Sequence, residues 1–457
     1  MMKLWNKGDA LDSFLEQFAT GTDFTLDQKL IFYDCVGTLA HATMLTKIGI
    51  LSSQELQQLK SCILDIIKKN NLEPYTIPAH AEDVHTFIEN LITAQLGPIG
   101  QKIHTARSRN DQIIVDIRLF ARDQLMDILE NLLELASILN QCAQQHEFVP
   151  LVGRTHFQPA MISSVGLWLS AFAESLLDDA SLLLNAYDIL NQNPLGSAAS
   201  YGAALPIDRA LVAQLLGFDK VQNNVLYVNN SRGKFESIAL SALNQIMIDL
   251  AKLSTDTIIF SSPEFGYLTL PKQFCFGSSI MPQKQNPDPL ELVRAKSASV
   301  MSNLFHTLEI IRSLPSGYNR DFQETKKPFF EGLQTTAQSL KVCSIIFKEI
   351  QINEVACAQA IKPELFATDY ALQLAQEGTP FRQAYKLVAQ NLASLETLNP
   401  VDNLKSKNHL GAPGNLGLAN TQKCILELQQ LCKEKQATYQ LALNTLLKEQ
   451  QMPYSKQ

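Results

Sequence analysis

The sequence of 457 residues lacks the short motifs that announce the common cofactors. No HExxH, GxGxxG or GKS/GKT stretch occurs, and the histidines and cysteines show no compact metal-ligand spacing. These absences predict a protein that needs no metal, nucleotide or flavin cofactor.

Long apolar runs and long basic clusters are missing as well. No run approaches the ~18 apolar residues that a membrane-spanning helix needs, and the N-terminus has no apolar signal core. A formal net charge of −7 argues against a nucleic-acid partner. The eight cysteines are scattered without a CxxC pair, which suits free thiols in a reducing compartment. We therefore expect a cytoplasmic protein with neither a membrane nor a nucleic-acid partner.

Glycine and proline are absent from several long stretches in which apolar residues recur at three- and four-residue spacing. A helix filling most of residues 111–149 would exceed ~50 Å, which is longer than the ~30 Å span of a small domain. Such helices are stable in bundles, often with several chains contributing. We predict a mostly α-helical subunit with an N-terminal helical domain at 1–111, a central bundle of long helices at 112–360 and a small helical domain at 361–457.

Polar stretches interrupt this helical pattern, and the first of them is "IHTARSRNDQ" at 103–112. It places Arg109 and Asn110 at the start of the longest helical stretch, where free helix amides and guanidinium groups bind anions well. A well-capped helix start, with Ser108 or Asn110 as the N-cap, explains the same residues. The spacing alone leaves both interpretations open.

The second polar stretch, "LVGRTHFQPAM" at 151–161, also precedes an apolar helix. Thr155, His156 and Gln158 would present a hydroxyl, an imidazole and an amide on one short loop. A histidine among hydrogen-bonding groups can hold a fixed tautomer for acid–base work. A lone histidine in such a place is more often a capping or packing residue, so this stretch by itself is a weak signal.

The third polar stretch, "FGSSIMPQKQNPDPLELVRAK" at 276–296, begins with a segment that cannot be helical. Gly277 would act as the hinge of a loop that closes over a ligand. Lys284 and Asn286 would then hold an anionic substrate, while nearby backbone amides lower the proton affinity of a serine. A flexible surface linker is the alternative, although its isoleucine and methionine are poor linker residues.

The second half of this stretch has a structural explanation. Asp288 would be the N-cap of the following helix, Pro289 would occupy the first helical position and Glu291 would complete a capping box. That role could account for Glu291 entirely.

The fourth polar stretch is "LPSGYNRDFQETKKPFF" at 314–330. Tyr318, Arg320, Gln323 and Lys326 would supply a phenol, an amide and two cations on a loop that enters the next helix. A solvated charged turn is an equally good explanation of the spacing.

The stretch "GSSIMPQKQNP" closely resembles the signature loop of the fumarase/aspartase superfamily, whose members are helical enzymes that eliminate fumarate from succinyl-bearing substrates. "IHTARSRNDQ", "AEDVHTFIE" at 81–89 and "LPSGYNRDFQETK" narrow the resemblance to the argininosuccinate lyase family. The similarity runs from about Leu4 to residue 385 and so covers most of the chain.

This resemblance implies a carbon–nitrogen lyase of arginine biosynthesis, which splits argininosuccinate into arginine and fumarate. It also implies a three-domain helical subunit and a homotetramer whose active sites are each shared between three subunits. The family pattern makes Ser278 the catalytic base and His156 the candidate acid, with Glu291 as the partner of that histidine. It places the substrate-binding residues at Asn110, Thr155, Tyr318, Gln323, Lys326, Lys284, Asn286, Arg109 and His85.

Several positions depart from the family pattern. Ala106 stands where a glycine is usual, and Arg154 and Pro159 replace a tyrosine and an arginine beside the histidine. Arg154 would restore the cation that is lost. The substrate-binding serine near the N-terminus has no clear counterpart, and Thr22 or Asp23 would stand in its place.

Two other hypotheses stay open at this point. The chain could be another lyase of the superfamily, acting on aspartate, malate or adenylosuccinate, although "SRND" and "YNRDFQETK" speak against it. It could also be a non-catalytic structural relative, against which the retention of Ser278, His156 and Lys284 argues.

Overall fold

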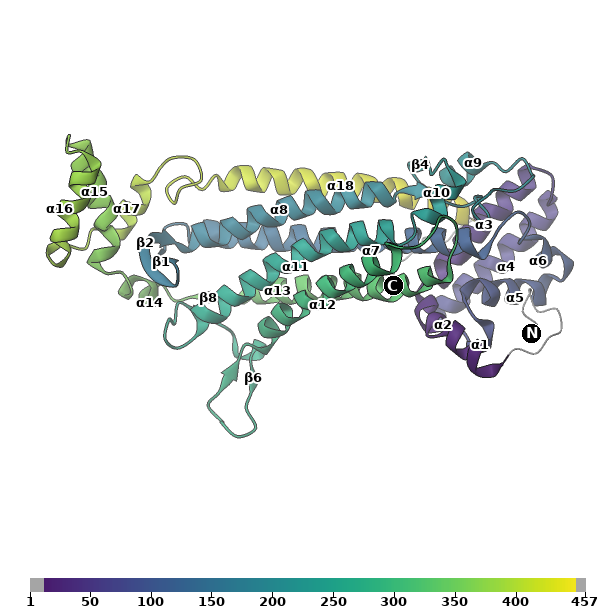
Figure 1. The fold of residues 1–457 in the computed structure, drawn as a ribbon, viewed down its shortest axis with the longest axis horizontal. Coiled ribbons are helices and arrows are strands. Elements are labelled where there is room, and N and C mark those ends of the chain that lie inside the picture. Colours follow the sequence, from purple (N-terminus) through teal and green to yellow (C-terminus); the bar gives the residue numbers. More distant parts are fainter. Residues whose placement is uncertain (1–11, 449–457) are drawn as a thin grey trace.

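Six long helices that lie side by side along the molecule dominate the structure, a computed structural model that describes residues 12–448 (Figure 1). Their bounds are α7 Arg109–Gln145, α8 Val165–Leu190, α11 Lys234–Ser261, α12 Asp288–Ile311, α13 Lys326–Glu349 and α18 Leu418–Leu447. The prediction of a mostly helical subunit with a bundle of long helices is confirmed. None of the helices within residues 12–448 combines the length and apolarity needed to cross a membrane.

Smaller helices gather at the two ends of this bundle (Figure 1). At one end lie α1 Ser13–Thr20, α2 Asp23–Leu26, α3 Ile31–Lys47, α4 Ser53–Leu72, α5 Val84–Leu96, α6 Pro98–Lys102, α9 Arg209–Leu215 and α10 Val225–Asn230. At the other end lie α14 Glu354–Gln359, α15 Ala367–Gln376, α16 Phe381–Gln390 and α17 Pro400–Ser406. Short 3₁₀ turns connect them at η1 Asp27–Leu30, η2 Ala79–Ala81, η3 Lys272–Phe274, η4 Arg320–Thr325, η5 Pro363–Phe366 and η6 Leu392–Ser394.

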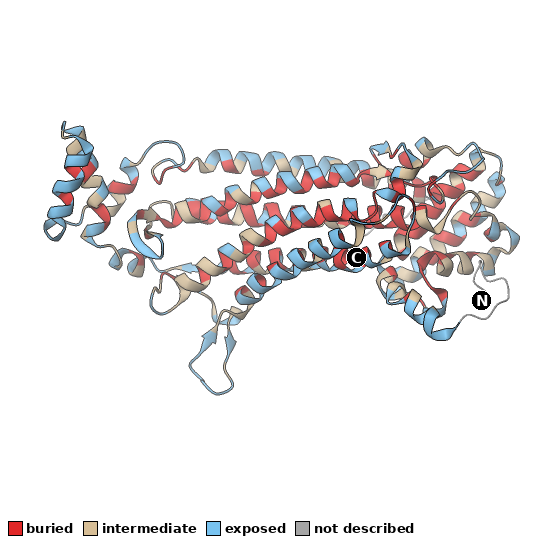
Figure 2. Ribbon diagram, in the orientation of Figure 1, coloured by how far each residue is buried: buried red, intermediate tan, exposed pale blue. Residues whose placement is uncertain are grey.

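The predicted domain boundaries at 112 and 360 stay predictions. Within the predicted C-terminal part, α15 to α17 lie at the far end of the bundle, whereas α18 returns along α7 and α8. The buried apolar residues form one large cluster that runs through the bundle into α3 and α5 (Figure 2). Small separate clusters lie between the β1–β2 hairpin and residues 365–404 and within α15 and α16.

The described strands are short, and each described sheet has two strands. The strands are β1 Pro150–Thr155, β2 Gln158–Ser164, β3 Gln192–Asn193, β4 Lys220–Val221, β5 Leu268–Thr269, β6 Phe276–Gly277, β7 Gln285–Asn286 and β8 Gln351–Ile352. Two of the pairs matter for function, because they carry loops that project from the bundle. These are the β1–β2 hairpin and the β6–β7 pair, which we call the arm and define as residues 276–286.

Local chemistry explains where the helices α7 and α8 begin. The longest helix, α7, starts with a capping box in which Ser108 is the N-cap. The Asp111 carboxylate completes the box by accepting a hydrogen bond from the Ser108 amide. Ser108, rather than Asn110, is therefore the cap. Gly166, in the first turn of α8, lets the chain pass tightly, because a Cβ there would lie 2.6 Å from the Glu147 Cα.

The capping box predicted around Asp288 is wrong. The helix α12 begins at Asp288 itself with Pro287 as its N-cap, and no side chain caps its first amides. The pyrrolidine ring of Pro287 restricts its φ, which is −81°, so the helical turn starts one residue earlier than expected. Glu291 is thereby left exposed and without a capping role.

Candidate active site

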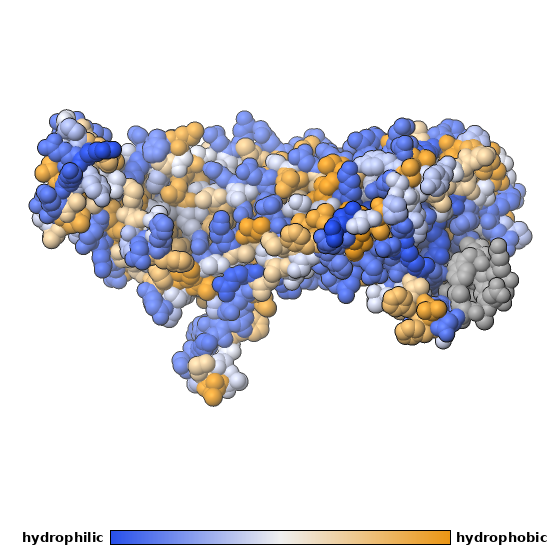
Figure 3. Space-filling model, viewed as in Figure 1, coloured by the Kyte–Doolittle hydropathy of each residue, from blue (hydrophilic) through white to orange (hydrophobic). Residues whose placement is uncertain are grey.

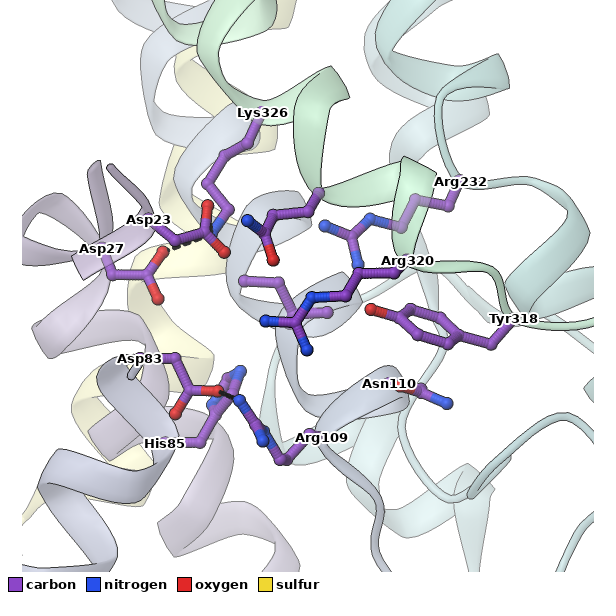
Figure 4. Close-up of a pocket in the computed structure, with 12 residues that line it drawn as sticks. Asp23, Asp27, Asp83, His85, Arg109, Asn110, Arg232, Tyr318, Arg320 and Lys326 are labelled. Carbon is purple, nitrogen blue, oxygen red and sulfur yellow. Dashed lines mark hydrogen bonds and ion pairs between the residues drawn. The ribbon is translucent and has the colours of Figure 1, made fainter. Parts of the chain in front are cut away.

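A cavity of about 150 Å³ lies where the N-terminal helices meet the beginning of α13. Its walls come from α2 and η1, the start of α5, the start of α7, the segment before α11, and the loop and turn that precede α13 (Figure 4). The lining residues are Asp23, Asp27, Asp83, His85, Arg109, Asn110, Ile113, Arg232, Tyr318, Arg320, Gln323 and Lys326. Of the four polar stretches of the sequence analysis, the first and the fourth therefore line one cavity, and the second and the third do not.

The start of α7 brings Arg109 and Asn110 to this cavity. They occupy the first positions after the Ser108 cap, whose side chain accepts a bond from the Asn110 amide at 3.2 Å. The two interpretations of this stretch are therefore compatible, since one short segment both caps the helix and lines the pocket. The N-terminal end of a 37-residue helix also adds a favourable dipole for an anion.

Lys326 is the most buried cation of the pocket, with 1% of its side chain exposed. Its Nζ pairs with Asp27 at 2.5 Å and with Asp23 at 3.0 Å. Burial alone would lower the pKa of Lys326, but the charges of Asp27 and Asp23 outweigh it and raise that pKa. Lys326 therefore stays protonated. Because two carboxylates share this one ammonium group, carboxylates outnumber cations on this side of the pocket.

Arg109 forms the opposite ion pair of the pocket. Its Nη2 pairs with Asp83, the N-cap of α5, and lies 3.4 Å from Glu82. Burial would raise the pKa of Asp83, but His85 and Arg109 oppose it and hold the pKa below its ordinary value. The Nη2 of Arg320 lies 3.4 Å from the same Glu82 oxygen, so one carboxylate pairs with two guanidinium groups.

Beside the pocket, His85 belongs to a buried acidic group. Its Nδ1 bonds to Asp34 and lies 3.5 Å from the Oδ2 of Asp116. Burial raises the pKa of Asp116 well above its ordinary value, and the carboxylates of Asp34 and Asp27 add to this effect. The ligand-type atoms of Asp34, His85 and Asp116 lie within 4.8 Å of one another, so a metal ion would fit by spacing. A proton held on Asp116 satisfies the same arrangement without one.

The remaining polar groups of the pocket come from the loop and turn before α13 and from the segment before α11. The Tyr318 hydroxyl points toward the middle of the cavity, and Arg232 and Arg320 face it from the side (Figure 4). The Gln323 amide donates to the Ala19 carbonyl at 3.2 Å, and Arg320 donates to the same carbonyl at 2.7 Å. These bonds hold the end of α1 over the pocket.

The β1–β2 hairpin carries Thr155 and His156 on an exposed turn at the end of the bundle opposite α3 to α6 (Figure 1). The described residues offer no hydrogen bond or ion pair that joins His156 to Glu291 within one chain. Both residues of the turn between the strands have positive φ, +52° at His156 and +60° at Phe157. Sequence reasoning predicted the residues but not this backbone.

The arm carries Ser278 and Lys284 away from the bundle, and it is exposed almost throughout (Figures 1 and 2). The Ser278 Oγ accepts the backbone amides of Ile280 and Met281 at 3.3 and 3.1 Å. Asn286 lies on β7, at the base of the loop. Figure 3 shows an apolar spot at the tip of the arm, where Ile280 is 83% exposed.

One chain therefore brings together His85, Arg109, Asn110, Tyr318, Gln323 and Lys326 in the pocket. It leaves Thr155, His156, Ser278, Lys284, Asn286 and Glu291 outside that cavity. Sequence reasoning missed three polar lining residues, namely Asp27, Asp83 and Arg232. The four-residue spacing of Asp23 and Asp27 and the acidic pair in "AEDVH" were available signals, whereas nothing in "NNSRGKF" marked Arg232.

Comparison with known proteins agrees with these observations. Residues 8–302 match the family described as Lyase. A protein of Thermotoga neapolitana named argininosuccinate lyase is 40% identical over 388 residues, which are 85% of this chain and 98% of that protein. A protein of the same name from Bacteroides fragilis is 39% identical over 414 residues, covering 91% of this chain and 92% of the relative.

Solved structures share the fold at lower sequence identity. An EDDS lyase in complex with formate superimposes with a TM-score of 0.82 at 21% identity and covers 96% of this chain and 95% of its own. A class II fumarase from Schistosoma mansoni superimposes with a TM-score of 0.71 at 16% identity, with 96% of each chain covered.

Proposed function

The chain belongs to the argininosuccinate lyase family, and from this premise we propose that it cleaves argininosuccinate into arginine and fumarate. The observation that carries the proposal is the pocket. It collects "AEDVH", "SRND" and "YNRDFQETK", the stretches that distinguish this family from other lyases of the superfamily, around a single cavity.

The charges of the pocket suit an amino-acid substrate. Lys326 is shared by Asp23 and Asp27, so that side favours an ammonium or guanidinium group. Arg232, Arg320 and the Tyr318 hydroxyl face the cavity from other walls and favour a carboxylate. Argininosuccinate carries groups of both kinds.

We assign proton removal to Ser278. The proton lies beside a carboxylate and is weakly acidic, so a neutral serine is too weak a base. Two backbone amides already donate to the Ser278 Oγ, and such donors favour its alkoxide. Lys284 on the same loop would add a positive charge when the arm closes on a substrate.

Ser278 and His156 account for the two proton transfers of the elimination. The Ser278 alkoxide takes the proton from carbon, the negative charge moves onto the neighbouring carboxylate, and cationic and amide donors stabilise this dianionic intermediate. As the carbon–carbon double bond of fumarate forms, the carbon–nitrogen bond breaks. We assign protonation of the departing guanidino nitrogen to His156, with Glu291 as the partner of the imidazole.

We further propose a homotetramer in which each active site takes residues from three subunits. The hairpin and the arm lie apart on one chain, and both lie apart from α2 and α5, which contribute residues to the pocket (Figure 1). A site that needs all three must therefore draw them from different copies. The helix α12 supports this proposal, because it exposes an apolar stripe of Met301, Phe305 and Leu308 at 39%, 59% and 39%.

We place the reaction in the cytoplasm. All eight cysteines are free, and most of them are buried, which fits a reducing compartment.

Fumarate release from argininosuccinate, followed by ultraviolet absorbance, tests the activity. Wild type is expected to release fumarate, and Ser278→Ala to be slower by about 10³-fold or more while it stays folded. Release from aspartate, malate or adenylosuccinate instead would make the chain another lyase of the superfamily. If none of the four substrates releases fumarate, the result would support the hypothesis of a non-catalytic structural relative.

Mixing two inactive variants tests the shared site. Ser278→Ala and Arg109→Met damage the arm and the pocket respectively, so mixed oligomers would contain some sites with both groups intact. Partial recovery of fumarate release after mixing and reassembly is expected, together with a tetrameric mass by sedimentation equilibrium. A fully active monomer would contradict the proposal.

A further inference from the structure

We infer that Arg154 is a positioning residue for His156, and that it acts by clamping the hairpin turn onto the aromatic ring of Phe265. The inference rests on the proposed function, because it assigns Arg154 a purpose only if His156 takes part in the reaction. Nothing in the resemblance assigns this role, since a tyrosine is usual at this position.

The turn itself calls for such a clamp. Thr155 pairs with Gln158, so His156 and Phe157 alone connect the two strands, and both have positive φ. This combination is favourable for glycine and asparagine, whereas a bulky aromatic residue such as Phe157 is strained there. A strained turn persists only where its surroundings hold it.

Burial does not hold this turn. All four residues from Thr155 to Gln158 are exposed, and Phe157 is 79% exposed. The adjoining ladder is irregular as well, because the register shifts between Gly153 and Arg154. The support must therefore come from specific contacts rather than from packing of the tip.

Arg154 contacts both the turn and the ring of Phe265. Its Nη1 donates to the Phe157 carbonyl at 3.2 Å, which closes the turn from one side. Its guanidinium carbon lies 4.9 Å from the centre of the Phe265 ring, within the range of a cation–π interaction. One planar side chain thus joins the turn to a ring that follows α11.

The ring is a firm anchor. Phe265 contacts Phe260 at 6.3 Å and Tyr267 at 5.5 Å between ring centres. Tyr267 is only 3% exposed, and Phe260 packs on Trp168 of α8. The clamp therefore connects the exposed turn to the buried frame of the bundle.

The geometry distinguishes this role from a second one, in which Arg154 binds a substrate carboxylate. The guanidinium is already engaged with a carbonyl and a ring, its Nε is buried, and the described residues give it no carboxylate partner. An arginine kept for an anion would direct its fork toward open space.

Two variants separate the roles. Arg154→Lys keeps the charge but loses the planar group that reaches both partners, and Phe265→Leu removes the ring while Arg154 remains. Each is expected to lower kcat about tenfold with little change in KM, because the imidazole loses its orientation while binding groups stay in place. Arg382→Lys, on exposed α16, is the matched control and is expected to match wild type.

The double variant gives a sharper test. Arg154→Lys with Phe265→Leu should be no slower than either single variant, since both break one clamp. Placing glycine at position 157, as Phe157→Gly, relieves the strain and should shrink the effect of Arg154→Lys. Unchanged kcat in Phe265→Leu, or a rise in KM alone in Arg154→Lys, would overturn the inference.

A readout that is independent of activity separates this inference from the proposed function. Amide hydrogen exchange at residues 155–158 should become faster in both clamp variants and stay unchanged in Arg382→Lys. If exchange becomes faster while wild type releases no fumarate, the clamp stands as a structural feature and the positioning role fails together with the proposed function. If wild type is active but exchange is unchanged, the clamp is refuted.

Discussion

The pocket and the arm are opposite solutions to holding a polar group. In the pocket, Lys326 is 1% exposed and shared by two carboxylates, so its charge is fixed by burial and pairing. On the arm, Lys284 is exposed and Ser278 is held by two backbone amides of its own loop. The binding groups are thus part of the folded core, whereas the reactive groups sit on a projection that the core does not need.

This difference teaches that stability and activity should separate by region. Losing a pocket charge leaves its buried partners unpaired and harms folding as well as binding. Losing an arm side chain removes almost no buried contact, so it should harm the reaction alone.

The two lysines make the most direct comparison. Lys326→Met should lower fumarate release by more than about 100-fold and destabilise the fold by about 3–5 kcal/mol, because Asp27 and Asp23 lose their cation. Lys284→Met should lower activity similarly but shift stability by no more than about 0.5 kcal/mol. Urea unfolding and initial rates would measure both. Equal destabilisation by the two variants would break the contrast.

Within the arm, the amide of Ile280 offers a narrower test. Ile280→Pro removes one of the two amides that donate to the Ser278 Oγ, and it should lower kcat by about 10²-fold. Ile280→Ala keeps the amide and should stay within about threefold of wild type. The melting temperature of both variants should match wild type. Equal loss in both would show that the side chain, rather than the amide, matters.

A buried carboxyl in the bundle tests stability without touching either region. Burial raises the pKa of Asp179 to about 7, with the nearby charges of Asp249 and Asp178 adding to the shift. The ionised form therefore costs stability above that pKa, and the cost vanishes below about pH 4, where folded and unfolded states are both protonated. Asp179→Asn should raise stability by about 1 kcal/mol at pH 8, after discount for solvent screening, and by little at pH 4. Unfolding at the two pH values checks this, and an equal gain at both would contradict it.

The smallest expected effect concerns the cap of α7. Ser108→Ala should cost about 1 kcal/mol and lower activity several-fold, because the capped turn carries Arg109 and Asn110 into the pocket. Ser52→Ala, which removes the matching capping box of α4 away from the pocket, should cost similar stability and leave activity unchanged. Thermal melting and initial rates on both variants would separate capping from positioning.

Sequence reasoning reached the helices because their signals are local. The absence of glycine and proline, with apolar spacing of three and four, predicts α7 and α11 without any knowledge of neighbours. The Ser108 cap was among the predicted alternatives for the same reason. The predicted cap of α12 was wrong because Pro287, whose ring restricts φ, is the N-cap. Asp288 is therefore already the first residue of the helix.

The site was predicted only in part. The polar stretches and the family resemblance named the residues, including His156 and Ser278, but not their separation along one chain. Asp83 and Asp27 were missed as lining groups, because their importance comes from Arg109 and Lys326, which lie far away in the sequence.

By itself, the sequence determined the long helices, the polar interruptions and the family, because periodicity, breakers and motifs act over short spans of chain. Only the tertiary structure decided which polar groups share a cavity, which project into solvent, and that Arg154 packs on Phe265. Those outcomes depend on burial and on contacts between residues far apart in the chain, and no local pattern encodes them.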